Sequence, residues 1–121
     1  MTTTGGEVEV RDNPADHRFE AWVDGQLAGY SEYRPFDGWL VFVHTEVDPA
    51  FGGRGVGSRL ARGALDTVRA RGLRLTPQCP FIASYIRSHP EYQDLVVGIR
   101  GTPLPRRGVD PRDPTRGREL R

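Results

Sequence analysis

Hydrophobic and polar positions alternate along the first third of the chain. Residues 7–10, 18–23 and 26–33 each place apolar side chains at about every second position. This is the period of a strand that buries one face. Asp24 and Gly25, between the second and third segments, form the dipeptide typical of a two-residue hairpin turn. The pattern therefore predicts an antiparallel meander at the start of the fold.

A run of consecutive apolar residues follows the meander. Residues 39–43 read Trp-Leu-Val-Phe-Val, and the segment continues to Val47 before Asp48 and Pro49 end it. A strand that is apolar on both sides is typical of the centre of a sheet whose two faces are covered. We therefore expect residues 39–47 to form a central strand.

Beyond this strand the apolar positions change to the period of a helix. Residues 55–71 carry a stripe of Val56, Leu60, Ala64, Leu65 and Val68, and Gly72 supplies a C-terminal stop. A short strand at residues 73–76 and a second helix at 80–88 follow. A strand, helix, strand crossover is right-handed, so residues 73–76 should run parallel to residues 39–47. The predicted fold class is α+β, with a mixed sheet.

The 121 residues are about the modal size of one domain. We expect one folded unit over residues 6–100 and a disordered N-terminus over 1–5. Residues 101–121 hold four prolines, three glycines and six arginines. They have too few apolar side chains to bury, so this segment is predicted to be a disordered Arg/Pro-rich tail.

All 17 basic residues are arginines, and the absence of lysine excludes several chemistries. A Walker-type phosphate loop and a Schiff-base or pyridoxal-phosphate enzyme both need a lysine. One cysteine and three histidines form no usual zinc spacing, so no metal is expected.

Charge and hydropathy bear on partners and location. Residues 1–100 carry 11 arginines against 13 acidic residues, a net charge of −2, so a nucleic-acid partner is not expected. No 18-residue apolar window and no signal-peptide pattern occur, so no membrane association is expected, and we predict a cytoplasmic protein.

A glycine-rich loop lies between the central strand and the long helix. It reads Gly52-Gly53-Arg54-Gly55-Val56-Gly57-Ser58. Glycines allow successive N–H groups to turn toward one point, and the N-terminus of the following helix adds its own unpaired N–H groups. Such a place binds phosphate. The spacing is not that of a dinucleotide fingerprint, and the alternative interpretation is a flexible connection.

The ends of the two parallel strands should lie at one edge of the sheet. They deliver His44, Thr45, Glu46 and Val47 from one strand and Gln78 and Cys79 from the other. Ligands of open sheets bind beyond such strand ends, so Cys79 and His44 are expected to meet there. Glu46 shares a face with His44 and is a weaker candidate for a general base. The alternatives are a buried, unreactive thiol and a hydrogen-bonded core histidine.

The motifs resemble those of the GNAT superfamily of acetyl-CoA-dependent N-acetyltransferases. Val47-Asp48-Pro49 matches its strand end, and Gly55-Val56-Gly57 matches the last positions of its Gln/Arg-x-x-Gly-x-Gly/Ala loop, although Gly52 replaces the first. HTEVDPAFGGRGVGSRL and PQCPFIASYIRSHPEY are similar to the small single-domain branch, and the resemblance covers about residues 8–96.

The resemblance implies acetyl transfer from acetyl-CoA to a small-molecule or protein amine. The amides of Gly53 to Ser58, with Arg54, Gly55, Val56 and Gly57 between them, would hold the CoA pyrophosphate. The N–H of Val47 would polarise the thioester. Cys79 and His44 would be the catalytic pair, and Phe81 and Tyr85 would line the pantetheine channel or only pack.

Two other functions are compatible with the sequence. One is a CoA-binding or acyl-CoA-sensing module with little catalysis, and the other is a protein that interacts through its arginine-rich tail. The acceptor, the oligomeric state and the choice between direct transfer and an acetyl-Cys79 intermediate stay open.

Overall fold

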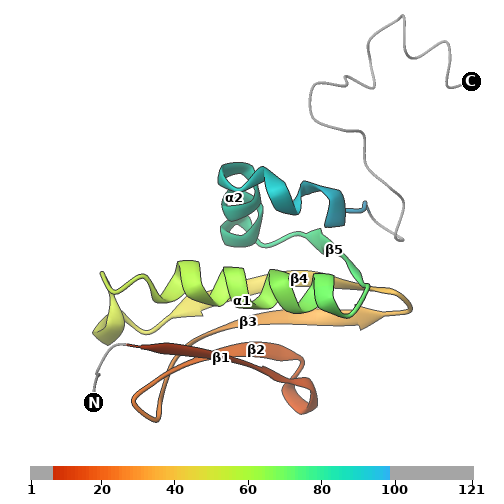
Figure 1. Cartoon of the computed structure of the whole chain (residues 1–121). Coiled ribbons are helices and arrows are strands. Elements are labelled where there is room, and N and C mark those ends of the chain that lie inside the picture. The colour runs from red at the N-terminus through yellow and green to blue at the C-terminus, as the bar shows by residue number, and fades with distance from the viewer. Residues whose placement is uncertain (1–6, 99–121) are drawn as a thin grey trace, which may run out of the picture.

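Five strands form one mixed sheet in the computed structural model, which describes residues 7–98. The strands are β1 (Val8–Asn13), β2 (Arg18–Val23), β3 (Gln26–Phe36), β4 (Trp39–Val47) and β5 (Arg74–Pro77), in that order across the sheet (Figure 1). The first four are antiparallel neighbours, and β5 runs parallel to β4. The predicted α+β class and the parallel pair are confirmed. The predictions for residues 1–5 and 101–121 lie outside the described residues.

The third strand is longer than residues 26–33, the segment that the sequence predicts. β3 runs on to Phe36, and Pro35 stands opposite Leu40 of β4. The pairing of β2 with β3 stops at Glu32, so this part of β3 has β4 as its partner and an edge on its other side. Proline, which has no N–H to donate, is tolerated at such an edge.

The long helix α1 (Val56–Ala70) crosses one face of the sheet (Figure 1). Its predicted apolar stripe is buried, and Gly63 lies so close to β1 that an added Cβ would meet the Val10 side chain at 2.7 Å. Gly72, with a φ of +69°, ends the helical segment as predicted. The core between α1 and the sheet includes Phe19 stacked on Phe42, with ring centroids 6.0 Å apart.

The chain continues from β5 into α2 (Pro80–Ser88) and a short 3-10 helix, Pro90–Leu95. His89 closes α2, where its ring Nδ1 lies 2.9 Å from the Tyr85 carbonyl. After the 3-10 helix, Val96 forms a parallel bridge with Leu75 at the outer edge of β5. This last part of the fold was not predicted.

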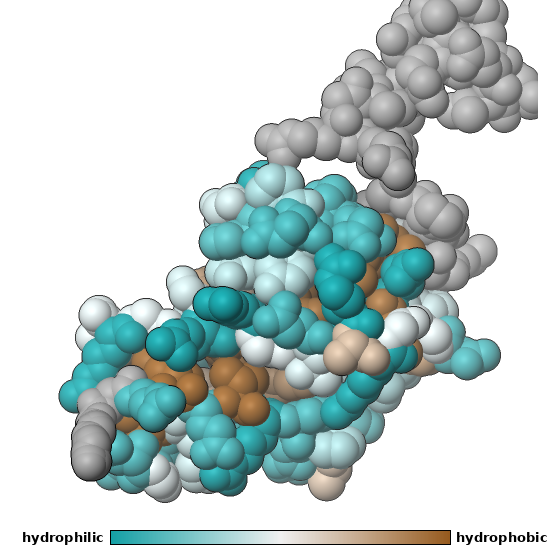
Figure 2. Space-filling model, in the orientation of Figure 1, coloured by the Kyte–Doolittle hydropathy of each residue, from teal (hydrophilic) through white to brown (hydrophobic). Residues whose placement is uncertain are grey.

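The two faces of the sheet differ in character. On the side that carries α1, Figure 2 shows mostly polar side chains with apolar patches between them. The opposite face of β1 to β4 carries charged and aromatic side chains, and His44 and Glu46 of β4 are exposed. The apolar run 39–43, which the sequence predicts to be covered on both sides, buries Leu40, Val41 and Phe42 and leaves Trp39 and Val43 half-buried.

Candidate functional site

The strands β4 and β5 part in the middle of β4. They pair from Trp39 and Arg74 to Phe42 and Pro77 and no further. Just beyond Phe42, β4 contains a bulge: Tyr33 opposes Phe42 and Glu32 opposes His44, so Val43 is the extra residue. Bulges bend a strand and re-aim its side chains, and they are frequent beside active sites. Residues 43–47 are therefore unpaired on the edge that faces the connection from β5 to α2, and we call this unpaired stretch between the two segments the gap.

The backbone N–H of Val47 points into this gap. The N–H of the next residue, Asp48, donates to the Ala28 carbonyl of β3 at 2.7 Å. Neighbouring peptide groups of a strand point to opposite edges, so the Val47 N–H points away from β3. Gly29 permits the close approach of β3 here, because a Cβ at this position would lie 2.8 Å from the Glu46 carbonyl oxygen. The Val47 N–H is therefore not paired with β3.

The glycine-rich loop presents a run of free amides beside the gap. Gly53 and Gly55 have φ values of +79° and +73°, and Gly55 is the N-cap of α1 without a side-chain cap. The first helical bond runs from Arg59 N–H to the Gly55 carbonyl, at 3.0 Å. Within residues 7–98, the N–H groups of residues 53–58 have no recorded protein acceptor. An anionic group fits such an amide cluster.

Only one of the two predicted aromatic residues faces this loop. Phe81 is 38% exposed, and its ring lies against Gly57 so closely that a Cβ there would meet Cζ at 2.7 Å. Tyr85 instead stacks on His89, with ring centroids 3.9 Å apart. Arg54 lies over the Phe51 ring at 5.5 Å, so its charge stays at the loop. Phe81 is thus placed to contact a ligand of the loop, and Tyr85 packs within its own helix end.

Cys79 lies on the α1 side of the gap and is 2% exposed. It is the N-cap of α2, and its N–H donates to the Phe42 carbonyl at 2.9 Å. Its Sγ donates to the Thr45 hydroxyl at 3.2 Å, and that hydroxyl lies 2.9 Å from the Ser31 hydroxyl. The thiol is therefore held in a chain of polar groups at the end of the paired region.

His44 and Glu46 lie on the other side of the sheet with Tyr30. Glu46 Oε1 accepts from the Tyr30 hydroxyl at 2.8 Å and lies 3.3 Å from His44 Nε2. The hydrogen bond from Tyr30, with a smaller contribution from His44, lowers the pKa of Glu46 below its ordinary value. The same bond raises the pKa of Tyr30. Glu46 is thus an ionised carboxylate over a wide pH range.

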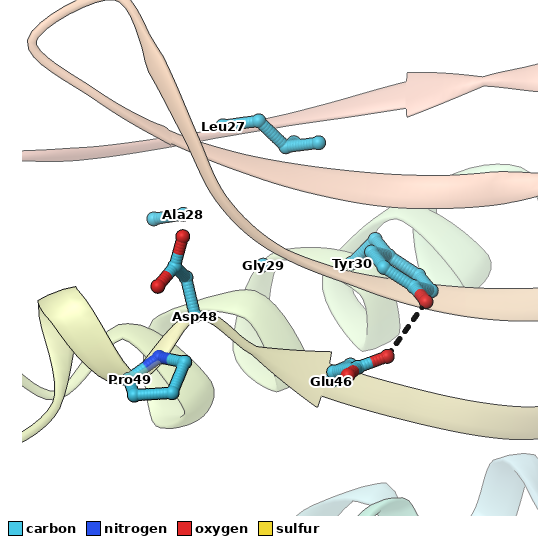
Figure 3. A pocket seen from close by; sticks show the side chains of 7 residues that line it. All are labelled: Leu27, Ala28, Gly29, Tyr30, Glu46, Asp48 and Pro49. Atoms are coloured by element: carbon cyan, nitrogen blue, oxygen red, sulfur yellow. Dashed lines mark hydrogen bonds between the residues drawn. The ribbon is translucent and has the colours of Figure 1, made fainter.

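A hollow of about 370 Å³ lies beside this cluster, at the end of β4 (Figure 3). Its lining is made by Leu27, Ala28, Gly29, Tyr30, Glu46, Asp48 and Pro49. Figure 3 shows the Tyr30 and Glu46 side chains joined by their hydrogen bond at its edge. Asp48 accepts from the Ala50 N–H at 2.9 Å and so caps the short 3-10 helix that starts the loop.

The structure does not bring His44 and Cys79 together. Cys79 contacts Thr45, and neighbouring strand residues point to opposite faces, so His44 and Cys79 lie on opposite sides of the sheet. The sequence predicted correctly that both residues lie near the ends of the two parallel strands. It did not predict that they lie on opposite faces of the sheet. They flank the same gap from two sides. The interpretation of His44 as a core histidine is also wrong, since its side chain is 55% exposed.

Comparison with known proteins decides the family. Residues 18–95 match the family model described as GCN5-related N-acetyl-transferase, and this range is more than half of the chain. The chain belongs to the GCN5-related N-acetyltransferase (GNAT) family. The range contains both segments beside the gap, the glycine-rich loop and Cys79.

Individual known proteins resemble this chain in fold or in sequence. A GCN5-like putative N-acetyltransferase from Staphylococcus aureus, solved by NMR, shares the fold with a TM-score of 0.56. It covers 76% of this chain and 90% of its own, at 23% identity. Protein NATD1 of Homo sapiens and of Xenopus tropicalis are each 40% identical over 52 residues, or 43% of this chain. The match covers 46% and 48% of those two relatives, just under half of their length.

Some residues of the candidate site were not found from the sequence. Tyr30 and Ser31 were not singled out, and Thr45 was placed at the edge without a role. A signal for Ser31 existed, because it is a polar residue that shares the buried face of β3 with Gly29 and Tyr33. Its partner Thr45 is distant in sequence, so only the fold shows the contact.

Two further findings concern the described part of this GNAT chain. Within residues 7–98 no three His, Cys, Asp or Glu side chains gather where they would hold a metal ion. No helix in the same range combines the length and the apolar character needed to cross a membrane.

Proposed function

We propose that the protein transfers an acetyl group from acetyl-CoA to an amine, through the gap between β4 and β5. The observation that carries this proposal is the position of the gap between two half-sites. On the α1 side lie the free amides of residues 53–58, and on the opposite side lies the cluster of Tyr30, Glu46 and His44. Two reactants that approach from different faces of the sheet meet only where the strands part.

The α1 side would receive the CoA. The pyrophosphate would accept hydrogen bonds from the amides of residues 53–58, where the positive end of the α1 dipole adds to the attraction. Phe81 would contact the pantetheine arm, because its exposed ring stands against Gly57 at the start of α1. The thioester would then enter the gap beside the Val47 N–H.

The Val47 N–H would stabilise the transition state. Attack by the amine converts the thioester carbonyl into an oxyanion, and a donor that points into the gap binds the oxyanion more strongly than the carbonyl. One such donor lowers the free-energy barrier by about 3 kcal/mol. Gly29 supports this role, because it allows β3 to hold the end of β4 in place.

The acceptor, a small-molecule or protein amine, would approach over the hollow beside Tyr30. It must be neutral to attack, and its proton would pass to His44 or to a water held by the Glu46 carboxylate. On the other side of the gap Cys79 would give its proton to the departing CoA thiolate. General acid–base catalysis of this kind contributes roughly 10² to 10⁴ in rate.

Calorimetric titration of CoA tests the proposal. We expect the wild-type protein to bind CoA and Gly55→Val to weaken the affinity by roughly tenfold or more, the value of one hydrogen bond to a charged group. The matched control is Gly38→Val. Gly38 also has a positive φ, of +91°, but it lies in the turn between β3 and β4. A wild-type protein that binds no CoA at millimolar concentration contradicts the proposal.

Mass spectrometry after mixing with acetyl-CoA alone separates two mechanisms. An acetyl adduct on Cys79 supports a covalent intermediate, and its absence together with turnover supports direct transfer. CoA binding without acetylation of any amine, peptide or protein acceptor would instead support the module that binds or senses acyl-CoA.

A further inference from the structure

Three buried or half-buried polar side chains form a chain beside the gap. Cys79 Sγ donates to Thr45 Oγ1 at 3.2 Å, and Thr45 Oγ1 lies 2.9 Å from Ser31 Oγ. The members come from the start of α2, from β4 and from β3. Ser31 is 0% exposed and Cys79 is 2% exposed.

The two hydroxyls stand where apolar side chains would be expected. Ser31 is in register with Phe19 of β2 and Thr45 of β4, so it lies on the core face of the sheet. A hydroxyl buried on such a face costs free energy unless it is hydrogen-bonded. Ser31 and Thr45 satisfy each other, and Thr45 also receives the thiol. The pair is therefore best explained by the group that it contacts, Cys79.

A hydroxyl is suited to both states of a thiol. It accepts a hydrogen bond from the S–H, and after rotation about its C–O bond it donates one to the thiolate. Ser31 makes the rotation possible, because its hydroxyl can accept from Thr45 in the first state and donate to it in the second. A valine at position 45 could neither accept a hydrogen bond from the thiol nor donate one to the thiolate.

We propose that Thr45 is the positioning residue of Cys79 and that Ser31 orients Thr45. This inference rests on the proposed function, in which Cys79 supplies a proton to CoA. In that step the Sγ–H bond breaks, its proton forms the S–H bond of free CoA, and the electron pair stays on Sγ. Thr45 then donates to the thiolate until Sγ takes a proton from water.

The S–H stretching band in the infrared spectrum tests the contact without any substrate. The chain has a single cysteine, so one band reports on one thiol. We expect Thr45→Val to move the band to the higher frequency of a thiol that donates no hydrogen bond, and Thr45→Ser to restore the wild-type position. Thr67→Val is the matched control, because the Thr67 hydroxyl donates within α1, to the Gly63 carbonyl at 2.8 Å. An unchanged band in Thr45→Val overturns the proposal.

Steady-state kinetics of acetyl transfer tests the role. Thr45→Val should lower kcat roughly tenfold, the value of one hydrogen bond to a charged group, with an unchanged KM for acetyl-CoA. Thr45→Ser should recover kcat, and Ser31→Ala should show a partial loss of the same kind. If Thr45→Val does not fold, Ser31→Ala carries the test, and a band and kcat equal to wild type then overturn the proposal. A shifted band with an unchanged kcat also overturns it.

The two kinds of failure are distinguishable. A protein that binds no CoA contradicts the proposed function, whereas the infrared band is measured on the free protein and reports on the Thr45 contact in either case.

Discussion

The two halves of β4 differ in the number of neighbouring strands with which they pair. From Trp39 to Phe42 the strand is paired on both edges, to β3 and to β5, and Leu40 and Phe42 are buried. From Val43 to Val47 it is paired to β3 only, and exposed side chains alternate with half-buried ones. One continuous strand thus has a structural half and a half whose edge and open face are accessible.

The difference shows how a sheet makes room for a reaction. A parallel neighbour occupies the peptide groups on one edge of a strand, and those groups become donors and acceptors for a ligand only where the neighbour leaves. Here the departure coincides with a bulge at Val43 that places Thr45 on the side of α1 and His44 on the other. The proposed acetyl transfer uses groups from two sides of the sheet, and this half of β4 carries side chains on both.

The largest expected effect on stability comes from a substitution in the half of β4 that is paired on both edges. Phe42 is 0% exposed and packs on Phe19 and Tyr33. Phe42→Ala should lower the free energy of unfolding by about 3–5 kcal/mol, because it removes a large ring and leaves a cavity. Urea denaturation measures this change.

His44→Ala provides the comparison within the same strand. The His44 side chain is 55% exposed, so its removal should change the free energy of unfolding by less than about 0.5 kcal/mol. Similar losses in the two variants would show that the halves do not differ in their contribution to stability.

A smaller effect is expected at a carboxylate on the open face. Burial alone would raise the pKa of Glu20, but hydrogen bonds from Asn13, Arg18 and Trp22 outweigh burial and lower the pKa. The folded state therefore favours the charged carboxylate. The resulting stability is complete above the unfolded pKa, near 4.5, and is lost as the pH falls through the lower pKa of the folded state.

Glu20→Gln tests this interpretation. At pH 7 the variant should be about 2 kcal/mol less stable than wild type, since it loses hydrogen bonds to a charged group. The difference in unfolding free energy between Glu20→Gln and wild type should become smaller as the pH falls below 4.5. Urea denaturation at a series of pH values measures it. Glu32→Gln is the control on the same face, because Glu32 has no recorded side-chain hydrogen bond within residues 7–98. A difference in unfolding free energy that stays constant with pH would contradict the charge-based account.

The elements of this fold could be predicted because their patterns are local. The bounds expected for residues 18–23, 39–47 and 80–88 are those of β2, β4 and α2. The bulge could not be predicted, because one extra residue in an apolar run leaves the pattern unchanged. The faces of His44 and Thr45 depend on that bulge. The contacts of Glu46 with Tyr30 and of Thr45 with Ser31 join residues 16 and 14 positions apart, which only the strand register shows.

The smallest expected effect on stability concerns Glu46, which lies in the half of β4 that is paired to β3 only. Glu46 is exposed and has two hydrogen-bond partners, whereas Glu20 is buried and has three, so Tyr30→Phe should leave the free energy of unfolding almost unchanged. The Tyr30 hydroxyl is the main cause of the lowered pKa of Glu46. Its loss should let that pKa rise toward the ordinary value.

In one route of the proposed mechanism a water held by Glu46 receives the proton of the amine, and this route needs the Glu46 carboxylate to be ionised. The acid limb of kcat plotted against pH should therefore move to higher pH in Tyr30→Phe, while kcat near pH 7 changes little. Tyr85→Phe is the matched control, because Tyr85 stacks on His89 in α2 and makes no contact with Glu46. An acid limb that stays in place in Tyr30→Phe, or moves equally in both variants, would remove Glu46 from the proton path and leave His44 as the base on this face.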